Sequence, residues 1–171
     1  NAATGQTGQR FSGNSTAGIT NLGQINAAQD GYVALLGHSV SHQGSISAPG
    51  GTVALGAGST LSLNFAGSKL VGLQVNSNQL NALAENGGLI QANGGQVLLS
   101  AGARDSLLAS VVNNSGVIQA RTVQEKEGKI VLLGGMAAGT TTVGGTLDAS
   151  APQGGNGGFI ETSAHTVNVS D

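Results

Sequence analysis

The chain has 171 residues, of which only 8% are charged and 2% aromatic, and its formal net charge is −2. Six scattered Lys and Arg residues argue against a basic surface for nucleic acid or an anionic membrane. The absence of cysteine excludes disulfides and thiol catalysis, and no apolar run reaches the roughly 18 residues that a membrane helix needs.

A phrase of the form Gly-x-[Ile/Leu]-x-Ala occurs five times along the chain. Its copies are GQINA at 23–27, GSISA at 44–48, GLIQA at 88–92, GVIQA at 116–120 and GTLDA at 145–149. After each copy comes a second phrase, Gly-x-[Val/Ile]-x-[Leu/Thr], beginning at 31, 51, 95, 128 and 158. A period of about 20–30 residues indicates a solenoid, in which each unit buries its apolar face against its neighbours.

Apolar and polar residues alternate with a period of two within each phrase, which predicts strands rather than helices. Each first phrase carries one large apolar residue, and together they form an expected ladder of Ile25, Ile46, Ile90, Ile118 and Leu147. Third strands are expected near 17–20 and 140–143, and the glycines suit the corners between strands.

Two or three short strands per unit, stacked in register, predict an all-β fold: a parallel β-helix of about five to six coils. Each coil adds roughly 4.8 Å of height, which gives a rod of about 25–30 Å. Residues 1–171 are expected to form a single β-helix segment, a fragment of a much longer protein. The long interval between the second and third copies is expected to contain a degenerate coil at 59–75.

Two segments interrupt the repeat and are expected to be short helical or loop excursions, at 76–87 and 104–112. The coils that follow them carry unusually apolar outward positions, namely Leu89, Leu98, Val117 and Val131. We hypothesise that one or both excursions cover this apolar wall. If the wall were bare, it would indicate a partner site instead.

Three asparagines, Asn21, Asn86 and Asn114, each stand two residues before a repeat glycine. Inward amides would need hydrogen-bonding partners, which equivalent amides of adjacent coils can supply. A corner role in left-handed geometry is the alternative. Both interpretations are structural.

Charged residues gather in one loop, 121–127, which contains Arg121, Glu125, Lys126 and Glu127. Two interpretations stay open for this loop. It is either a solvated connection that keeps a rod soluble or a contact for a partner.

The sequence offers no pattern for catalysis or a cofactor. His38 and His42 would lie about 13 Å apart on a strand, too far to share a metal ion. The stray carboxylates are Asp30, Glu85, Asp105, Asp148 and Glu161. A glycosidase needs two carboxylates about 5–10 Å apart, and no two of these share a strand face. We therefore predict no enzyme, no cofactor and no metal.

Several long phrases resemble the two-partner secretion exoproteins, the filamentous-haemagglutinin type of large bacterial adhesin. They include RFSGNSTAGITNLGQINAAQDGYVALLGHSVSHQGSISAPGGTVAL, NALAENGGLIQANGGQVLL, SVVNNSGVIQARTV and VGGTLDASAPQGGNGGFIETSA. The resemblance implies a right-handed β-helix and export by a dedicated outer-membrane transporter to the bacterial cell surface. The chain resembles the later half of the secretion domain and the start of the stalk. No family motif supplies catalytic residues.

The expected function is that of a structural and secretion segment of a secreted adhesin that supports adhesion or biofilm formation. The segment itself is expected to be a monomer. The alternative is a binding module for a host-cell or matrix glycan or protein, a haem carrier or the transporter pore. That module would use the 121–127 loop or the apolar wall. Less favoured alternatives are the stalk of a contact-dependent toxin and a polysaccharide-acting enzyme.

Overall fold

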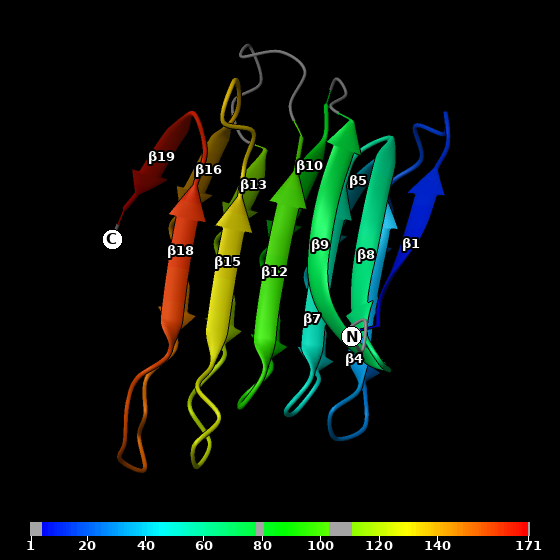
Figure 1. Ribbon diagram of the computed structural model, residues 1–171. Coiled ribbons are helices and arrows are strands. Elements are labelled where there is room, and N and C mark those ends of the chain that lie inside the picture. The colour runs from blue at the N-terminus through cyan, green and yellow to red at the C-terminus, as the bar shows by residue number, and fades with distance from the viewer. Residues whose placement is uncertain (1–4, 78–80, 103–110, 171) are drawn as a thin grey trace.

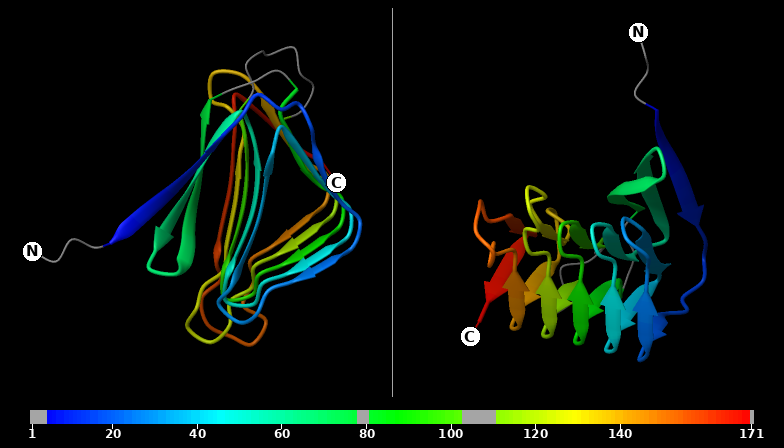
Figure 2. Two further views of the ribbon diagram at one scale, coloured as in Figure 1. Left: turned by 90° about the vertical axis from the view of Figure 1, so that its right-hand side faces the viewer. Right: turned by 90° about the horizontal axis from the view of Figure 1, so that it is seen from below.

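The computed structural model describes residues 5–77, 81–102 and 111–170, and every regular element in those ranges is a β-strand. Three parallel sheets wind around one interior, and their strands lie side by side along the axis of the molecule (Figure 1). Viewed along that axis, successive coils superpose and enclose a narrow triangular interior (Figure 2). The predicted all-β parallel β-helix is therefore confirmed.

The strands follow one another in the same order in every coil. Sheet B contains β2 (Ile19–Asn21), β5 (Ser39–His42), β10 (Leu83–Asn86), β13 (Val112–Asn114), β16 (Thr140–Val143) and β19 (Thr166–Val169). Sheet C contains β3 (Gln24–Asn26), β6 (Ser45–Ser47), β11 (Leu89–Gln91), β14 (Val117–Gln119) and β17 (Thr146–Asp148). Sheet D contains β4 (Tyr32–Gly37), β7 (Thr52–Ala57), β12 (Gln96–Ala101), β15 (Lys129–Leu133) and β18 (Phe159–Ser163). These strands make five coils and the first strand of a sixth.

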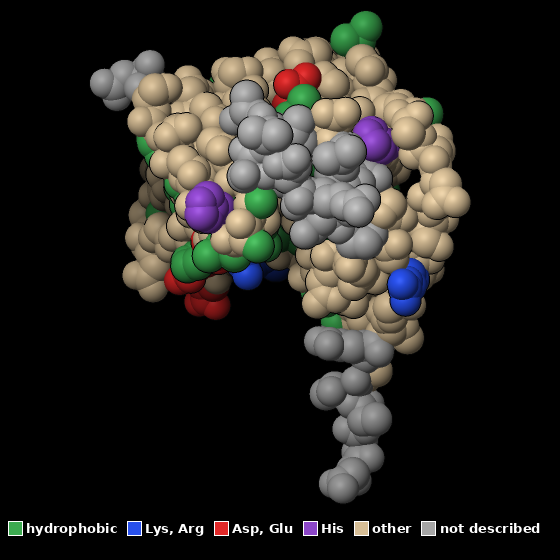
Figure 3. Space-filling view, turned by 90° about the horizontal axis from the view of Figure 1, so that it is seen from above, with side chains coloured by type: hydrophobic (Ala, Val, Ile, Leu, Met, Phe, Trp, Pro, Cys, Tyr) green, Lys and Arg blue, Asp and Glu red, His purple; other side chains and the backbone are tan. Residues whose placement is uncertain are grey.

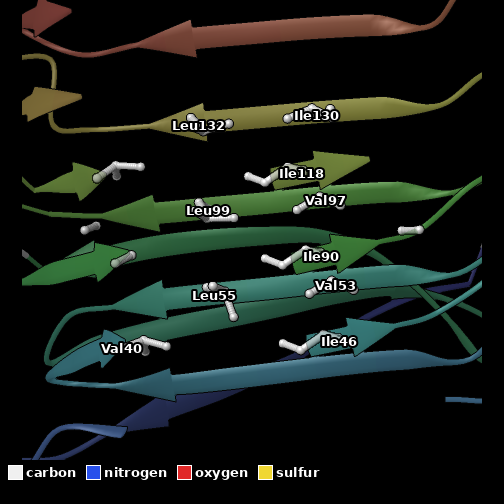
Figure 4. Packing of buried hydrophobic residues seen from close by; sticks show 14 of the residues in the cluster. Val40, Ile46, Val53, Leu55, Ile90, Val97, Leu99, Ile118, Ile130 and Leu132 are labelled. Carbon is white, nitrogen blue, oxygen red and sulfur yellow. The ribbon is translucent and has the colours of Figure 1, made fainter. Parts of the chain in front are cut away.

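Equivalent side chains of successive coils stack in rows inside the helix. The row on sheet C runs through Ile25, Ile46, Ile90, Ile118 and Leu147, which are paired strand to strand. Its three central isoleucines are fully buried, and Figure 4 shows them stacked beside the valine and leucine rows of sheet D. Because one row supplies apolar neighbours to the next, each coil completes the core of the coil before it.

The corners are tight because the backbone of one coil passes close to the next. A Cβ placed on Gly116 would overlap the carbonyl oxygen of Gly88 in the preceding coil. Another corner has Gly94 at a φ of 72°, a left-handed conformation that favours glycine. The glycines of the repeat therefore fix where the chain turns.

The segment 59–75 is not a degenerate coil, contrary to the sequence-based expectation. It forms an antiparallel hairpin of β8 (Thr60–Ala66) and β9 (Lys69–Ser77), and β1 (Gln6–Ser12) pairs with the outer side of β8. This three-stranded unit, sheet A, stands outside the coils and covers part of sheet D (Figures 1 and 2). Alternation alone could not distinguish a coil from a hairpin, since both bury every second residue.

Sheet A and sheet D enclose a second apolar cluster, separate from the interior of the coils. Its buried members are Ala54, Leu61, Leu63, Phe65, Leu70, Leu73, Leu98 and Val131. Leu98 and Val131 of the apolar wall are therefore covered, as expected. The hairpin covers them, in place of the segments 76–87 and 104–112 that we expected to do so. Leu89 and Val117 lie on sheet C instead and are partly buried.

The expected helix at 76–87 is wrong for its described residues. Leu83–Asn86 forms strand β10, which pairs with β5 and β13 on either side. Leu83 and Ala84 fit a strand because the edges of β5 and β13 accept the backbone, and tertiary pairing overrides local preference. Most of the second expected helix, 104–112, lies outside the described residues, and its final residue opens β13.

Candidate functional site

The charged loop 121–127 follows β14 at the corner where sheet C meets sheet D. Arg121 Nε lies 2.6 Å from Asp148 Oδ2 of the next coil. Asp148 also accepts a hydrogen bond from the backbone N–H of Ser150 at 3.0 Å. Hydrogen bonds from Ser150 and the nearby Arg121 guanidinium hold the pKa of Asp148 below its ordinary value. Arg121 thus fastens two adjacent coils.

The remaining charges of this loop differ in their partners. Lys126 Nζ lies 3.5 Å from Asp30 Oδ1, a weaker and more exposed ion pair. Glu125 and Glu127 are exposed, and no ion pair to them occurs within the described ranges. The loop lies beside the equivalent loop of the next coil, and Thr122 Oγ1 donates to the Asn156 carbonyl across the gap at 2.9 Å. These two loops frame a shallow hollow of about 240 Å³.

A buried polar row runs along sheet B through the asparagines singled out from the sequence. Asn86 Nδ2 donates to Asn114 Oδ1 at 2.7 Å, and both side chains are fully buried. Asn86 Oδ1 accepts a hydrogen bond from the backbone N–H of Gly88 at 3.2 Å, so the side-chain amide also pairs with a backbone group at the corner of its own coil. The structure places Asn21 in the same row, two coils before Asn86, with His42 between them. The row joins coils through hydrogen bonds rather than through apolar contact.

His42 occupies the place in this row that asparagine holds in the adjacent coils. Asn21 Nδ2 lies 3.0 Å from His42 Nδ1, and His42 Nε2 lies 3.2 Å from the Leu89 carbonyl oxygen. Because an amide N–H can only donate and a carbonyl can only accept, these contacts assign the proton to Nε2 of a neutral ring. Burial lowers the pKa of His42 from its ordinary value, although the bond to Leu89 opposes this shift. The environment therefore favours the neutral ring.

The described residues offer no cluster of metal ligands on the outer surface. In the part of the chain that the structure describes, no group of three or more His, Asp or Glu side chains is close enough to hold a metal ion. Glu85 instead accepts a hydrogen bond from Ser41 Oγ at 2.6 Å on the outer face of sheet B. The side of the molecule seen from above relative to Figure 1 carries only a few charged side chains (Figure 3). The described residues also contain no helix suited to crossing a bilayer.

Comparison with known families bears on these features directly. A family model described as the TPS secretion domain matches residues 1–167, almost the whole chain. The chain belongs to the TPS secretion domain family. No curated protein sequence matches the chain. The match confirms the resemblance to two-partner secretion exoproteins, and it implies a secreted exoprotein that depends on a dedicated transporter.

Two features of this TPS secretion domain were missed from the sequence although signals for both exist. The runs 60–66 and 69–75 are separated by Gly67-Ser68, which is typical of a two-residue hairpin turn. His42 stands two residues before Gly44, the same offset at which three of the other four coils have asparagine. Aligning the coils on their glycines would have placed His42 in the polar row.

Proposed function

We propose that this TPS secretion domain is the secretion and folding scaffold of an adhesin-type exoprotein at the bacterial cell surface. The outer-membrane transporter exports the chain unfolded, and the coils form outside. The folded rod then carries distal parts of a longer exoprotein that support adhesion or biofilm formation. The observation that carries this proposal is the unbroken register of the three stacked sheets within a matched secretion domain.

The arrangement supports folding by templating. Each new strand pairs with an edge presented by the preceding coil, and each row extends by one side chain. Successive coils therefore fold in the order in which they emerge from a pore. The lack of cysteine suits this route, since no disulfide can form before passage.

Export with and without the transporter tests this proposal. The chain, with a secretory leader and an epitope tag, is expressed beside candidate two-partner transporters, and the medium is assayed for folded, protease-resistant protein. We expect release only when a cognate transporter is present. Release without any transporter, or retention with every transporter of the type, would contradict the proposal.

A second candidate function is binding through the 121–127 loop. The observation that favours it is the hollow of about 240 Å³ beside the exposed Glu125 and Glu127. A host glycan, a host protein or a haem carrier would have to reach these two carboxylates. A glycan array and a haem-carrier panel can be screened with the unmodified protein and with the double variants Glu125→Lys/Glu127→Lys and Glu125→Gln/Glu127→Gln. Binding that both variants lose would locate the site, whereas equal binding by all three proteins would exclude these carboxylates.

A further inference from the structure

Strand β9 presents an open edge beside an uncovered part of the rod. In sheet A the strand order is β1-β8-β9, so β9 has a strand neighbour on only one side within the described ranges. Beyond that edge lie the outer faces of β15 and β18 (Figure 1), where Lys129 and Phe159 are exposed and Leu133 is partly buried. An open edge carries unpaired backbone N–H and C=O groups that can accept another strand.

Two adjoining hollows follow this edge. The first, of about 250 Å³, lies between the stretch from Val71 to Leu73 of β9 and the side chains of β12 and β15. The second, of about 550 Å³, continues from Leu73 to Asn76 and reaches Leu133. Together they form a groove, which we call the β9 groove, with the open strand edge as one wall.

The floor of the β9 groove is apolar and its far side is charged. Leu98, Val131 and Leu133 form the floor. Lys129 and Glu161 are the charged side chains that line the first hollow. Val131 and Glu161 are register partners, as are Lys129 and Phe159, so the two charges stand about 7 Å apart along the strand direction. An occupant with an acidic and a basic residue two positions apart would complement them.

The shape of the edge defines the kind of occupant. Two register shifts in the pairing with β8, at Asn64/Phe65 and Thr60/Leu61, leave Val71 and Asn76 of β9 as extra residues without a register partner on β8. Such bulges disturb a ladder, and the regular stretch between them is Gly72–Val75. The carbonyl of Leu70, before this stretch, already accepts bonds from Thr52 Oγ1 and Gln96 Nε2. The free part of the edge thus suits one short strand in a fixed register.

We propose that a single extended segment of a partner polypeptide adds to β9 along Gly72–Val75 as the fourth strand of sheet A. Its backbone pairs with the open edge, and the side chains of one face meet the groove in the order acidic, basic and apolar, opposite Lys129, Glu161 and Leu133. The site lies away from the 121–127 loop and does not rest on the secretion role proposed above. Main-chain pairing supplies affinity, while the floor and the two charges supply selectivity.

Synthetic peptides provide the test. Two fluorescein-labelled probes, Thr-Asp-Thr-Lys-Thr-Val and its reversed order, place the acidic, basic and apolar side chains on one face, cover both strand directions and are titrated by fluorescence anisotropy. We expect one of them to bind with a dissociation constant below about 1 mM. Two N-methylated forms of that probe, each with every second backbone amide blocked, should then differ in affinity. Methylation of the edge that pairs with β9 weakens binding at least about tenfold, and methylation of the opposite edge does not.

Matched protein variants exclude nonspecific apolar binding. Leu133→Lys places a charge on the groove floor, while Leu22→Lys makes the same change at a 75% exposed corner remote from the groove. Only the first should abolish binding, and circular dichroism verifies that both remain folded. The proposal is overturned if neither probe binds, if both methylated forms bind equally, or if folded Leu133→Lys binds as well as the unmodified protein.

Discussion

His42 makes the buried polar row the acid-sensitive part of the rod. Its neighbours are Asn21 and the Leu89 carbonyl, which together require a neutral ring. Burial places its folded-state pKa below the ordinary value of 6.5, so the unfolded chain binds the proton more tightly. The free energy of unfolding should therefore be fully retained above pH 6.5 and decrease as the pH falls from 6.5 towards the folded-state pKa.

The variant His42→Asn tests this dependence, because asparagine fills the same place in the adjacent coils. Guanidinium unfolding at pH 7.5 and pH 5 should show a smaller loss of stability on acidification for the variant than for the unmodified protein. Asp148 does not interfere at these pH values. Its pKa is held below the ordinary 3.8, chiefly by hydrogen bonds from Ser150, so its contribution is lost only as the pH falls below that value. Equal acid sensitivity of the two proteins would assign it to other groups.

At the scale of the element, the corner glycines decide whether coils can approach each other. A methyl group on Gly116 would collide with the backbone of Gly88, which cannot move without shifting a whole coil. Gly23 has the same position in the first coil, where the nearest atom to an added Cβ is Asn21 Oδ1 at 3.9 Å. Gly116→Ala should lower the free energy of unfolding by about 2 kcal/mol or more, and Gly23→Ala by much less. Denaturant titration of both variants measures the difference, and similar losses would contradict the steric argument.

The hairpin of β8 and β9 has its own core and should unfold on its own. Leu63 is 3% exposed and packs in the cluster between sheets A and D, not inside the coils. Leu63→Ala should weaken this layer by about 2–5 kcal/mol. In native-state hydrogen exchange, amides of β8 and β9 should then lose protection while those of β11 and β14 keep theirs. Loss of protection throughout the molecule would show that the two clusters unfold together.

The elements also show how far sequence reasoning reaches here. The five coils were predictable because their strands repeat with fixed glycines, and each repeat carries its own inward Ile or Leu. The hairpin was not recognised as such, since Leu61, Leu63 and Phe65 alternate as a coil strand would. The β9 groove was beyond prediction from sequence, because Val131 and Leu73 meet only through the packing of sheet A on sheet D.

For the whole molecule, stacking along one axis means that the strands of sheets B, C and D pair only with those of adjacent coils, while sheet A packs on several coils. The free energy of unfolding is then a sum of contributions from the coils and from the interfaces between them. The effect of a destabilising substitution should therefore depend on the position of its coil in the stack. Leu99 is fully buried in the third coil, whereas Leu147 is only partly buried in the fifth. A destabilising substitution in a central coil should weaken the coils on both sides of it, whereas one in a terminal coil should unfold only that end of the stack.

Tyr32 offers a local probe for this difference because it is the only tyrosine and lies in the first coil. Its ring meets Phe65 edge-on with the centroids 5.4 Å apart, so its fluorescence reports the first coil and the hairpin. In urea, Leu99→Ala should lower both the tyrosine midpoint and the midpoint seen by circular dichroism. Leu147→Ala should broaden the circular dichroism transition at low urea while the tyrosine midpoint stays unchanged. If Leu147→Ala shifts both signals equally, the five coils unfold as one unit, and the nearest-neighbour description does not apply to this rod.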